Sequence, residues 1–244
     1  MNYKNKYFLI TGAYRGIGKS IAIYFAKKHA NLVLTYHLNK ELTWELGKKL
    51  AKEYQINVEI LPLDLKKEES IQELYQSLSQ KKIIIDYLIN NAALSRDNDY
   101  LSKTKEEFMD VLETNVVGTF LMIQYFDKQF CGKNIFNISS TDGIDTGSIY
   151  SVDYNASKAA INIMGKTLSM ISPNNIITIC PNWVNTESTL QINKDYLKSE
   201  MQRIHQKNLI SVNKIPILID QCIQKKVKSG SIIKIEDDND GRIN

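Results

Sequence analysis

The sequence is poor in cysteine, proline and histidine. Its 244 residues include only three cysteines, four prolines and three histidines. The cysteines, at positions 131, 180 and 222, form neither a CxxC pair nor a zinc-binding spacing, which favours a reduced cytoplasmic compartment over a disulfide framework. The histidines form no HExxH motif, so we expect no metal site.

Long hydrophobic runs and a strong charge of one sign are also missing. The apolar run within MNYKNKYFLITG is too short for a signal peptide or a membrane span, and no later run is long enough either. The 31 basic and 27 acidic side chains leave a net charge of only +4, and the basic residues occur in scattered pairs. No basic stripe is interleaved with aromatic residues. We therefore expect a cytoplasmic protein that binds neither membranes nor nucleic acid.

Short apolar runs alternate along the chain with longer amphipathic segments. Seven runs are predicted to be buried strands: residues 7–11, 32–36, 58–63, 84–89, 134–139, 176–180 and 231–235. Segments of helical length separate most of them, including 18–29, 40–54 and 68–81. Apolar strands joined by helical crossovers indicate a parallel sheet covered on both faces. The sequence thus predicts an α/β fold, a single Rossmann-like, doubly wound domain over residues 1–244, ending in a polar, partly frayed tail, EDDNDGRIN.

The first predicted strand leads directly into a glycine-rich stretch, TGAYRGIG, which contains Gly12, Gly16 and Gly18. Glycines allow a sharp turn from strand to helix, and they let a pyrophosphate approach the free amides where the helix begins. A glycine-rich turn without a ligand is the alternative. The position of the stretch between a strand and an amphipathic helix favours binding of a dinucleotide.

Polar side chains also follow the third and fourth predicted strands. Asp64, in LPLDLK, could accept a hydrogen bond from an adenine amino group, or it could cap the next helix. Asn90 and Asn91 precede the small Ala92, which would let a flat ring lie close to the backbone. An ordinary asparagine turn is an equally good interpretation of this stretch taken alone.

The stretch SVDYNASKAA places Tyr154 four residues before Lys158. In a helix this spacing brings both side chains to one face. A nearby ammonium group lowers the pKa of a phenol from its usual value of about 10, which eases proton transfer near neutral pH. A YxxxK pair alone is more often an ordinary surface pair, so the other motifs decide its meaning.

The order of the motifs resembles that of the short-chain dehydrogenase/reductase family. The chain contains, in sequence, TGxxxGxG, NNAA, ETN at 113–115, ISS at 138–140, YxxxK and PNWVNT at 181–186. It looks most like the 3-oxoacyl-(acyl-carrier-protein) reductase group, with which it shares TGAxRGIG, an SRDN-like stretch and ETN. The resemblance covers about residues 6–235. Two departures are NNAA in place of the usual NNAG, and Asn182 in place of a glycine.

The resemblance implies four catalytic residues. Tyr154 matches the family's catalytic acid/base, and Lys158 matches the lysine that lowers its pKa and holds the nicotinamide ribose. Ser140 matches the serine that orients the substrate carbonyl, with Ser139 the less favoured choice. Asn115 matches the asparagine of a proton-relay water chain.

The resemblance also implies a set of cofactor-binding residues. They are Gly12, Tyr14, Arg15, Gly16, Ile17 and Gly18 in the pyrophosphate turn, Asp64 and Leu65 at the adenine, Asn91 and Ala92 at the adenosine ribose, and Pro181, Val184 and Thr186 at the nicotinamide, together with Tyr154 and Lys158. No acidic residue lies between positions 31 and 40, where an NAD site has a carboxylate for the ribose 2′-hydroxyl. Arg15 and His37 could instead bind a 2′-phosphate. We therefore expect NADP(H) to be preferred over NAD(H).

The activity implied by the resemblance is hydride transfer between nicotinamide C4 and a carbonyl or alcohol carbon. The substrate would be a 3-oxoacyl thioester or another small ketone, free or bound to a carrier protein, beneath a lid at about residues 187–208. A nucleotide-sugar epimerase or dehydratase shares the Tyr/Lys pair but usually has GxxGxxG spacing, and a non-catalytic dinucleotide sensor typically loses one of the pair.

Residues 107–126 are apolar on nearly every side of a helix. This predicts a homotetramer or homodimer, and burial of the helix beneath a loop is the alternative.

Overall fold

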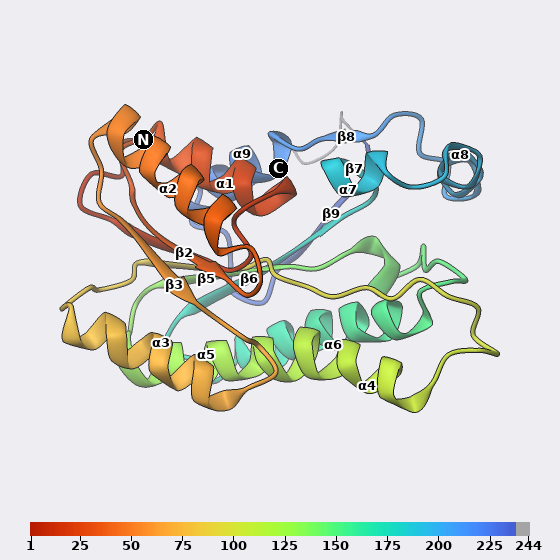
Figure 1. Cartoon of the computed structure of the whole chain (residues 1–244), viewed down its shortest axis with the longest axis horizontal. Helices are drawn as coiled ribbons and strands as arrows, with labels where there is room; N and C mark the ends of the chain where they lie inside the picture. The colour runs from red at the N-terminus through yellow and green to blue at the C-terminus, as the bar shows by residue number, and fades with distance from the viewer. Residues whose placement is uncertain (238–244) are drawn as a thin grey trace.

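The computed structural model describes residues 1–237, and the expectation for the tail beyond them lies outside these residues. A parallel sheet of seven strands, in the order β3-β2-β1-β4-β5-β6-β9, forms the centre of the molecule (Figure 1). The strands are β1 (Tyr7–Ile10), β2 (Asn31–Tyr36), β3 (Val58–Pro62), β4 (Tyr87–Asn90), β5 (Asn134–Ile138), β6 (Asn175–Pro181) and β9 (Ile232–Ile235). A separate parallel pair joins β7 (Val184–Asn185) to β8 (Ile210–Ser211). The predicted doubly wound α/β fold is confirmed.

Helices cover both faces of the sheet (Figure 1). One layer contains α1 (Gly16–Ala26), α2 (Lys40–Tyr54) and α9 (Lys214–Gln224), and the other contains α3 (Glu68–Gln80), α4 (Lys105–Leu112), α5 (Gly118–Gln129) and α6 (Val152–Leu168). Two short helices, α7 (Glu187–Leu190) and α8 (Lys194–Arg203), follow β7. The layers arise from the period-two geometry of the strands. In β1, Phe8 and Ile10 join the core cluster on one face, whereas Leu9 joins the cluster on the other.

The predicted fourth strand, at residues 84–89, is displaced toward the C-terminus in the structure. Lys82 has a left-handed backbone with φ of 55°, and Ile84 is 60% exposed. Asp86 then uses its carboxylate to accept a hydrogen bond from the backbone amide of Tyr7, at 3.1 Å. The apolar run therefore begins in irregular, partly exposed backbone, and β4 begins only at Tyr87.

The predicted helix over residues 107–126 is interrupted by one π-helical segment. A capping box between Thr104 and Glu107 starts α4, residues Glu113–Val117 form the π-helix, and α5 continues from Gly118. A π segment widens the helix by one residue and often occurs at functional sites. Here it contains Asn115, whose side chain is fully buried.

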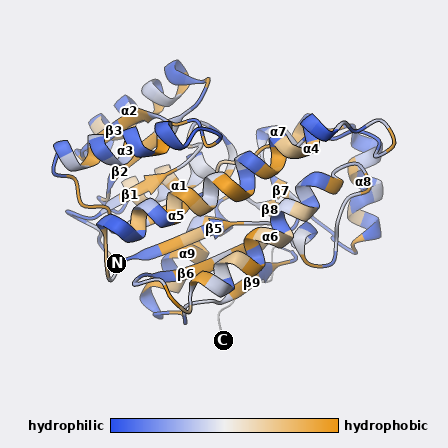
Figure 2. Cartoon of the chain, turned by 90° about the horizontal axis from the view of Figure 1, so that it is seen from below, coloured by the Kyte–Doolittle hydropathy of each residue, from blue (hydrophilic) through white to orange (hydrophobic). Residues whose placement is uncertain are grey.

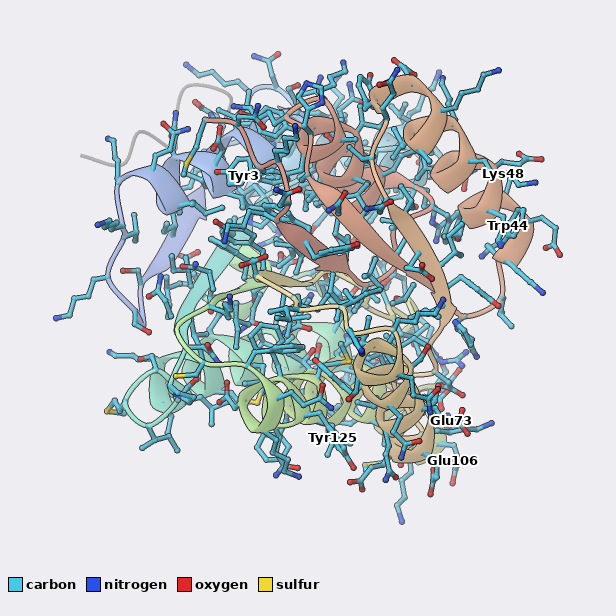
Figure 3. The ribbon with its side chains drawn as sticks, turned by 90° about the vertical axis from the view of Figure 1, so that its left-hand side faces the viewer. Tyr3, Trp44, Lys48, Glu73, Glu106 and Tyr125 are labelled. Carbon is cyan, nitrogen blue, oxygen red and sulfur yellow. The ribbon has the colours of Figure 1, made fainter. Side chains whose placement is uncertain are left out.

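The N-terminus is fastened to α9 on the far side of the sheet from α6. The Tyr3 hydroxyl donates to the Asp220 carboxylate at 2.6 Å, and the Lys28 ammonium group lies 2.7 Å from the same carboxylate. Figure 3 shows Tyr3 inside the upper layer, whereas Trp44 and Lys48 lie on its outer edge. Burial by itself raises the pKa of Asp220. The hydrogen bonds that its carboxylate accepts, chiefly from Lys28 and Tyr3, outweigh this effect and lower the pKa to about 2.

Candidate active site

The glycine-rich turn between β1 and α1 has the backbone that its glycines require. Gly12 and Gly16 have φ values of +65° and +53°, which residues with a Cβ rarely adopt. A Cβ on Gly18 would lie 2.5 Å from the Gly12 oxygen. The side-chain amide of Asn91 donates to the oxygens of Thr11 and Gly12, at 2.9 and 3.1 Å. The turn is thus rigid and its helix begins close to the sheet.

The hydroxyl group of Thr11 joins this turn to the end of β4. It accepts hydrogen bonds from the backbone amides of Asn91 and Ala92, each at 2.9 Å. Beside it, the Arg15 guanidinium lies 5.2 Å from the centre of the Tyr14 ring, and Arg15 is exposed. The structure therefore brings the sequence-predicted residues of the two turns together at one edge of the sheet.

The residues predicted to lie near the adenosine form a polar group at the ends of β2 and β3. Asp64 accepts a hydrogen bond from the backbone amide of Lys66 at 3.1 Å, and its carboxylate lies 3.7 Å from His37. It does not cap α3, because that helix begins at Glu68 after Lys67. Leu65 is 7% exposed and packs in the core. Of the alternatives for Asp64, the helix cap is therefore wrong.

A cavity of about 470 Å³ opens beside the carboxyl ends of β1, β4, β5 and β6. Among its lining residues are nine of those predicted from the sequence: Arg15, Ile17, Asn91, Ser140, Tyr154, Lys158, Pro181, Val184 and Thr186. The structure adds residues that the sequence did not single out, chiefly Asp97, Asp142, Trp183, Thr189, Ile192 and Ile204. Crevices at this edge of doubly wound sheets commonly bind ligands.

Tyr154 and Lys158 lie on one face of α6, as their spacing predicts. The Lys158 ammonium group is 5.1 Å from the centre of the Tyr154 ring, and it donates to the carbonyl of Ile138 at 2.9 Å. Burial lowers the pKa of Lys158 to about 8. Burial, followed by the negative charges of Asp142 and Asp97, raises the pKa of the Tyr154 phenol.

The expectation that Lys158 lowers the phenol pKa stays a prediction, although the surroundings of the phenol act in the opposite direction. The ammonium group is directed at a backbone carbonyl of β5, and two carboxylates on the cavity wall oppose ionisation of the phenol. The sequence contained no signal for these carboxylates. Asp97 lies in the irregular segment after β4 and Asp142 in the short 3-10 helix Thr141–Gly143, and the fold brings both to the cavity that Tyr154 lines.

The two serines after β5 have different surroundings. Ser139 is 3% exposed, and its hydroxyl donates to the carbonyl of Lys158 at 3.1 Å. Ser140 accepts a hydrogen bond from the backbone amide of Asp142 at 3.1 Å, and it has only a long contact, 3.5 Å, with the carbonyl of Pro181. The Ser140 hydroxyl proton is therefore the freer of the two for a substrate oxygen.

Asn115 is engaged with the backbone beside the cavity. Its side-chain oxygen accepts from the amide of Leu94 at 2.7 Å, and its side-chain nitrogen donates to the Leu94 carbonyl at 2.8 Å. The nitrogen also donates to the hydroxyl of Ser157 at 3.0 Å, one turn after Tyr154. In this arrangement the Asn115 side chain connects the π-helical segment to α6 and to the loop after β4.

Asn182, in the position of the family's usual glycine, makes side-chain bonds of its own. Its amide oxygen accepts from the hydroxyl of Thr141, and its amide nitrogen donates to the carbonyl of Glu236 at 3.2 Å. The side chain thus joins the end of β6 to the segment after β5 and to the segment after β9. The asparagine therefore adds contacts beside the cavity where a glycine would make none.

A carboxylate already accepts a hydrogen bond from one backbone amide of the glycine-rich turn. Glu187 accepts a hydrogen bond from the Gly16 amide at 3.0 Å, and its other oxygen lies 3.9 Å from the Lys19 ammonium group. Thr186, whose hydroxyl caps α7, places Glu187 there. An oxyanion at this position shows that the start of α1 suits an anion. The glycine turn, the Asn91 clamp and the cavity therefore fit a dinucleotide.

The segment from α7 to α8 lies against the loop that follows β5. The Tyr196 hydroxyl is 2.7 Å from the Ser148 hydroxyl, and the Arg203 guanidinium donates to the carbonyls of Thr146 and Gly147 at 2.6 and 3.2 Å. These contacts bring α8 over the outer side of the cavity, within the stretch predicted to cover the substrate.

Two kinds of feature were also sought over residues 1–237. Within that range, no cluster of histidine, cysteine and acidic side chains has the arrangement needed to hold a metal ion. None of the described helices combines the length and the apolar character that crossing a membrane would require.

Comparisons with known proteins found a matching family model and several relatives. A family model described as short chain dehydrogenase matches residues 6–197. The chain is similar to the 3-oxoacyl-(acyl-carrier-protein) reductase FabG of Chlamydia trachomatis, with 32% identity over 203 residues, covering 80% of each chain. It is also similar to FabG of Aquifex aeolicus, with 29% identity over 208 residues, covering 82% of this chain and 83% of that protein.

Solved structures share the fold over nearly the whole chain. A short chain dehydrogenase from Burkholderia cenocepacia, in complex with NADP, has a TM-score of 0.90 at 17% identity and covers 98% of this chain and 100% of its own. The RhlG/NADP active-site complex of Pseudomonas aeruginosa has a TM-score of 0.86 at 22% identity and covers 96% of each chain. At identities of 17% and 22%, the similarity of these structures establishes that the chain has the same fold.

Proposed function

The chain belongs to the short-chain dehydrogenase family, as an NAD(P)-dependent oxidoreductase, and we propose that it reduces the carbonyl group of a small substrate with NADPH. The observation that carries this proposal is the common cavity of Ser140, Tyr154 and Lys158, next to a rigid glycine-rich turn. The curated relatives named above are 3-oxoacyl-(acyl-carrier-protein) reductases. We therefore propose a 3-oxoacyl thioester, or another small ketone, as the first substrate to test.

Each side chain has a role that its surroundings support. The bound nicotinamide would supply the hydride, and the protein supplies position and electrostatics. Because burial and two nearby carboxylates raise the pKa of Tyr154, its phenol keeps the proton that a carbonyl oxygen must receive. The Ser140 hydroxyl would donate a hydrogen bond to that oxygen, and Lys158 would hold the nicotinamide ribose. Asn115 would act through the shape of the π-helical segment and its hold on Leu94.

The preference for NADP(H) rests on charge at the adenosine end. Arg15 is exposed at the mouth of the cavity, where its guanidinium could bind a 2′-phosphate with charge-assisted hydrogen bonds. Two of the similar structures are complexes with NADP, which supports the proposal. Asp64, 3.7 Å from His37, opposes a second anion there, so the contribution of Arg15 has to be the larger one.

The covering segment, the domain count and the assembly are part of the same proposal. Residues 187–208 would form a lid, fastened in this structure by Tyr196 and Arg203 to the loop after β5. Residues 1–244 would form one domain, and several copies of the chain would associate through α4, the π-helical segment and α5.

Turnover with defined substrates tests this function. Purified protein would be given NADPH or NADH with short and long 3-oxoacyl thioesters and with small neutral ketones, and oxidation of the nicotinamide would be followed by absorbance. The proposal predicts turnover of at least one carbonyl substrate, faster with NADPH. Tight cofactor binding with no turnover of any carbonyl would contradict it and would indicate a dinucleotide sensor instead.

A further inference from the structure

A buried ion pair lies at the start of α6, the helix that contains Tyr154. The Lys103 ammonium group is 2.8 Å from the Asp153 carboxylate, and the two side chains are only 3% and 0% exposed. Lys103 belongs to the irregular segment between β4 and α4, and Asp153 lies in the first turn of α6. The pair thus connects the segment after β4 to the start of α6, across 50 positions of the chain.

The atoms of this pair lead to the backbone of Tyr154. One oxygen of Asp153 accepts from the Lys103 ammonium group, and the other accepts from the Tyr154 amide at 2.9 Å. The ammonium group also donates to the carbonyl of Arg96 at 2.7 Å. The pair therefore fixes both the loop after β4 and the residue proposed to donate the proton.

Two further bonds join the same segments. The Ser151 hydroxyl donates to the Asp97 carboxylate at 2.6 Å, and the Asn98 amide donates to the Tyr150 carbonyl at 3.0 Å. Tyr150 and Ser151, just before α6, and Asp153, in its first turn, are therefore all bonded to the segment after β4. No comparable fastening is needed for helix formation, because α6 would start equally well with an exposed carboxylate in its first turn.

Burying the pair is costly, which makes a purely stabilising role a poor explanation. Desolvation of two charges offsets much of their attraction, and replacing a buried ion pair by apolar residues is often neutral or stabilising. What a buried pair does supply is a fixed geometry, since an alternative arrangement would leave a charge unpaired in the interior. At this location the geometry that it fixes is that of the Tyr154 backbone relative to the cavity.

We propose that Lys103 and Asp153 are positioning residues that hold Tyr154 in register with the loop that lines the cofactor side of the cavity. This inference rests on the proposed reductase activity. The side chains do not line the cavity themselves, so they act through the α6 backbone. Removing the pair should therefore lower kcat while cofactor binding remains intact.

The test is the neutral double variant Lys103→Met with Asp153→Asn, which leaves no unpaired buried charge. We expect it to fold and to bind NADPH as the wild type does, but with kcat lowered by at least about tenfold, as for a small misplacement of a catalytic group. The dependence of kcat on pH should also change, because the Tyr154 phenol would move relative to Asp97 and Asp142. Wild-type kcat and pH profile in this variant would overturn the proposal.

A matched control separates positioning from stability. Lys28 and Asp220 form another largely buried pair, at 2.7 Å, on the opposite side of the sheet. The double variant Lys28→Met with Asp220→Asn should lower the melting temperature without changing the kcat of the folded enzyme. An equal loss of kcat in both double variants would show that the effect is only one of stability, and it would also overturn the proposal.

A milder variant decides the matter if the Lys103/Asp153 double variant does not fold. Lys103→Arg keeps the buried pair charged but alters the distance between its two groups. It should lower kcat by less than the double variant would, with the cofactor dissociation constant unchanged, and an unchanged kcat would contradict the proposal. A wild-type enzyme that reduces no carbonyl would instead refute the proposed function, so the two failures are distinguishable.

Discussion

The Lys158 ammonium group donates to the Ile138 carbonyl at 2.9 Å and has no hydrogen bond to Tyr154, although it lies 5.1 Å from the centre of that ring. The lysine is only 2% exposed. Its charge is thus held in the interior by one backbone oxygen, and burial lowers its pKa to about 8. This relationship gives the protein without cofactor a stability that depends on pH.

We expect the contribution of Lys158 to stability to rise with pH. Its pKa is about 8 in the folded protein and 10.5 in the unfolded chain, so the unfolded chain binds more protons between these values, and folding becomes more favourable as pH increases through them. Denaturant unfolding of the wild type and of Lys158→Met would be compared from pH 7 to pH 10. The wild type should gain about 1.4 kcal/mol per pH unit on the variant above pH 8, and a constant difference would contradict the buried charge.

Glu187→Gln should bind the cofactor more tightly. The Glu187 carboxylate accepts from the Gly16 amide, so it competes with a pyrophosphate for the start of α1. Removing its charge should tighten NADPH and ADP-ribose by about two- to fivefold, the usual size of a charge effect at a helix N-terminus. Binding would be measured by calorimetry.

Two controls accompany this variant. Adenosine 2′-monophosphate has no pyrophosphate, so its affinity should not change. Glu106→Gln removes an exposed carboxylate from the first turn of α4, at the outer edge of the molecule (Figure 3), and should leave all affinities as they are. Weaker NADPH binding in Glu187→Gln would refute the competition.

Arg15→Ala should weaken NADPH binding and leave NADH binding nearly unchanged. The guanidinium is exposed at the cavity, and a charge-assisted bond to a 2′-phosphate is expected to contribute about 1.5–3 kcal/mol. The dissociation constants of both reduced cofactors would be measured for the wild type and the variant. Tighter NADH than NADPH binding by the wild type would end the case for NADP(H).

The outer face of α4, the π-helical segment and α5 should form a subunit contact. Figure 2 is seen from this side of the molecule, and apolar stretches lie along α5. Val117 and Phe120 are 48% and 37% exposed, which is unusual for apolar side chains in the middle of a helix. Sedimentation at micromolar concentration should show a dimer or tetramer, and Phe120→Glu should dissociate it. Ile84→Glu, at a remote exposed residue, serves as the control, and a monomeric wild type would contradict the proposal.

The sequence predicted the fold because its strands are continuous apolar runs separated by segments of helical length. That alternation indicates a parallel sheet whatever the exact bounds of each strand. The sequence misplaced the start of β4, because Ile84 is apolar but exposed in the irregular backbone before the strand. Periodicity alone does not distinguish a strand residue from an apolar residue in a neighbouring turn.

The candidate site was predictable where one motif contains the chemistry and not where distant residues meet. The Tyr154 and Lys158 spacing and the glycine-rich turn are local patterns. Lys103 and Asp153 look like ordinary surface charges in the sequence, yet they are buried against each other in the structure. Glu187 reaches the Gly16 amide from 171 positions away. Only the tertiary structure shows such encounters.

The central claim is that Tyr154 donates the proton to the substrate carbonyl, and Tyr154→Phe tests it most directly. The variant keeps the ring in place and removes only the hydroxyl, so the cavity and the cofactor site remain. With a carbonyl substrate that the wild type reduces, kcat should fall by about a hundredfold or more, while the dissociation constant of NADPH stays the same. Reduction at close to the wild-type rate by a variant that binds NADPH normally would contradict the account.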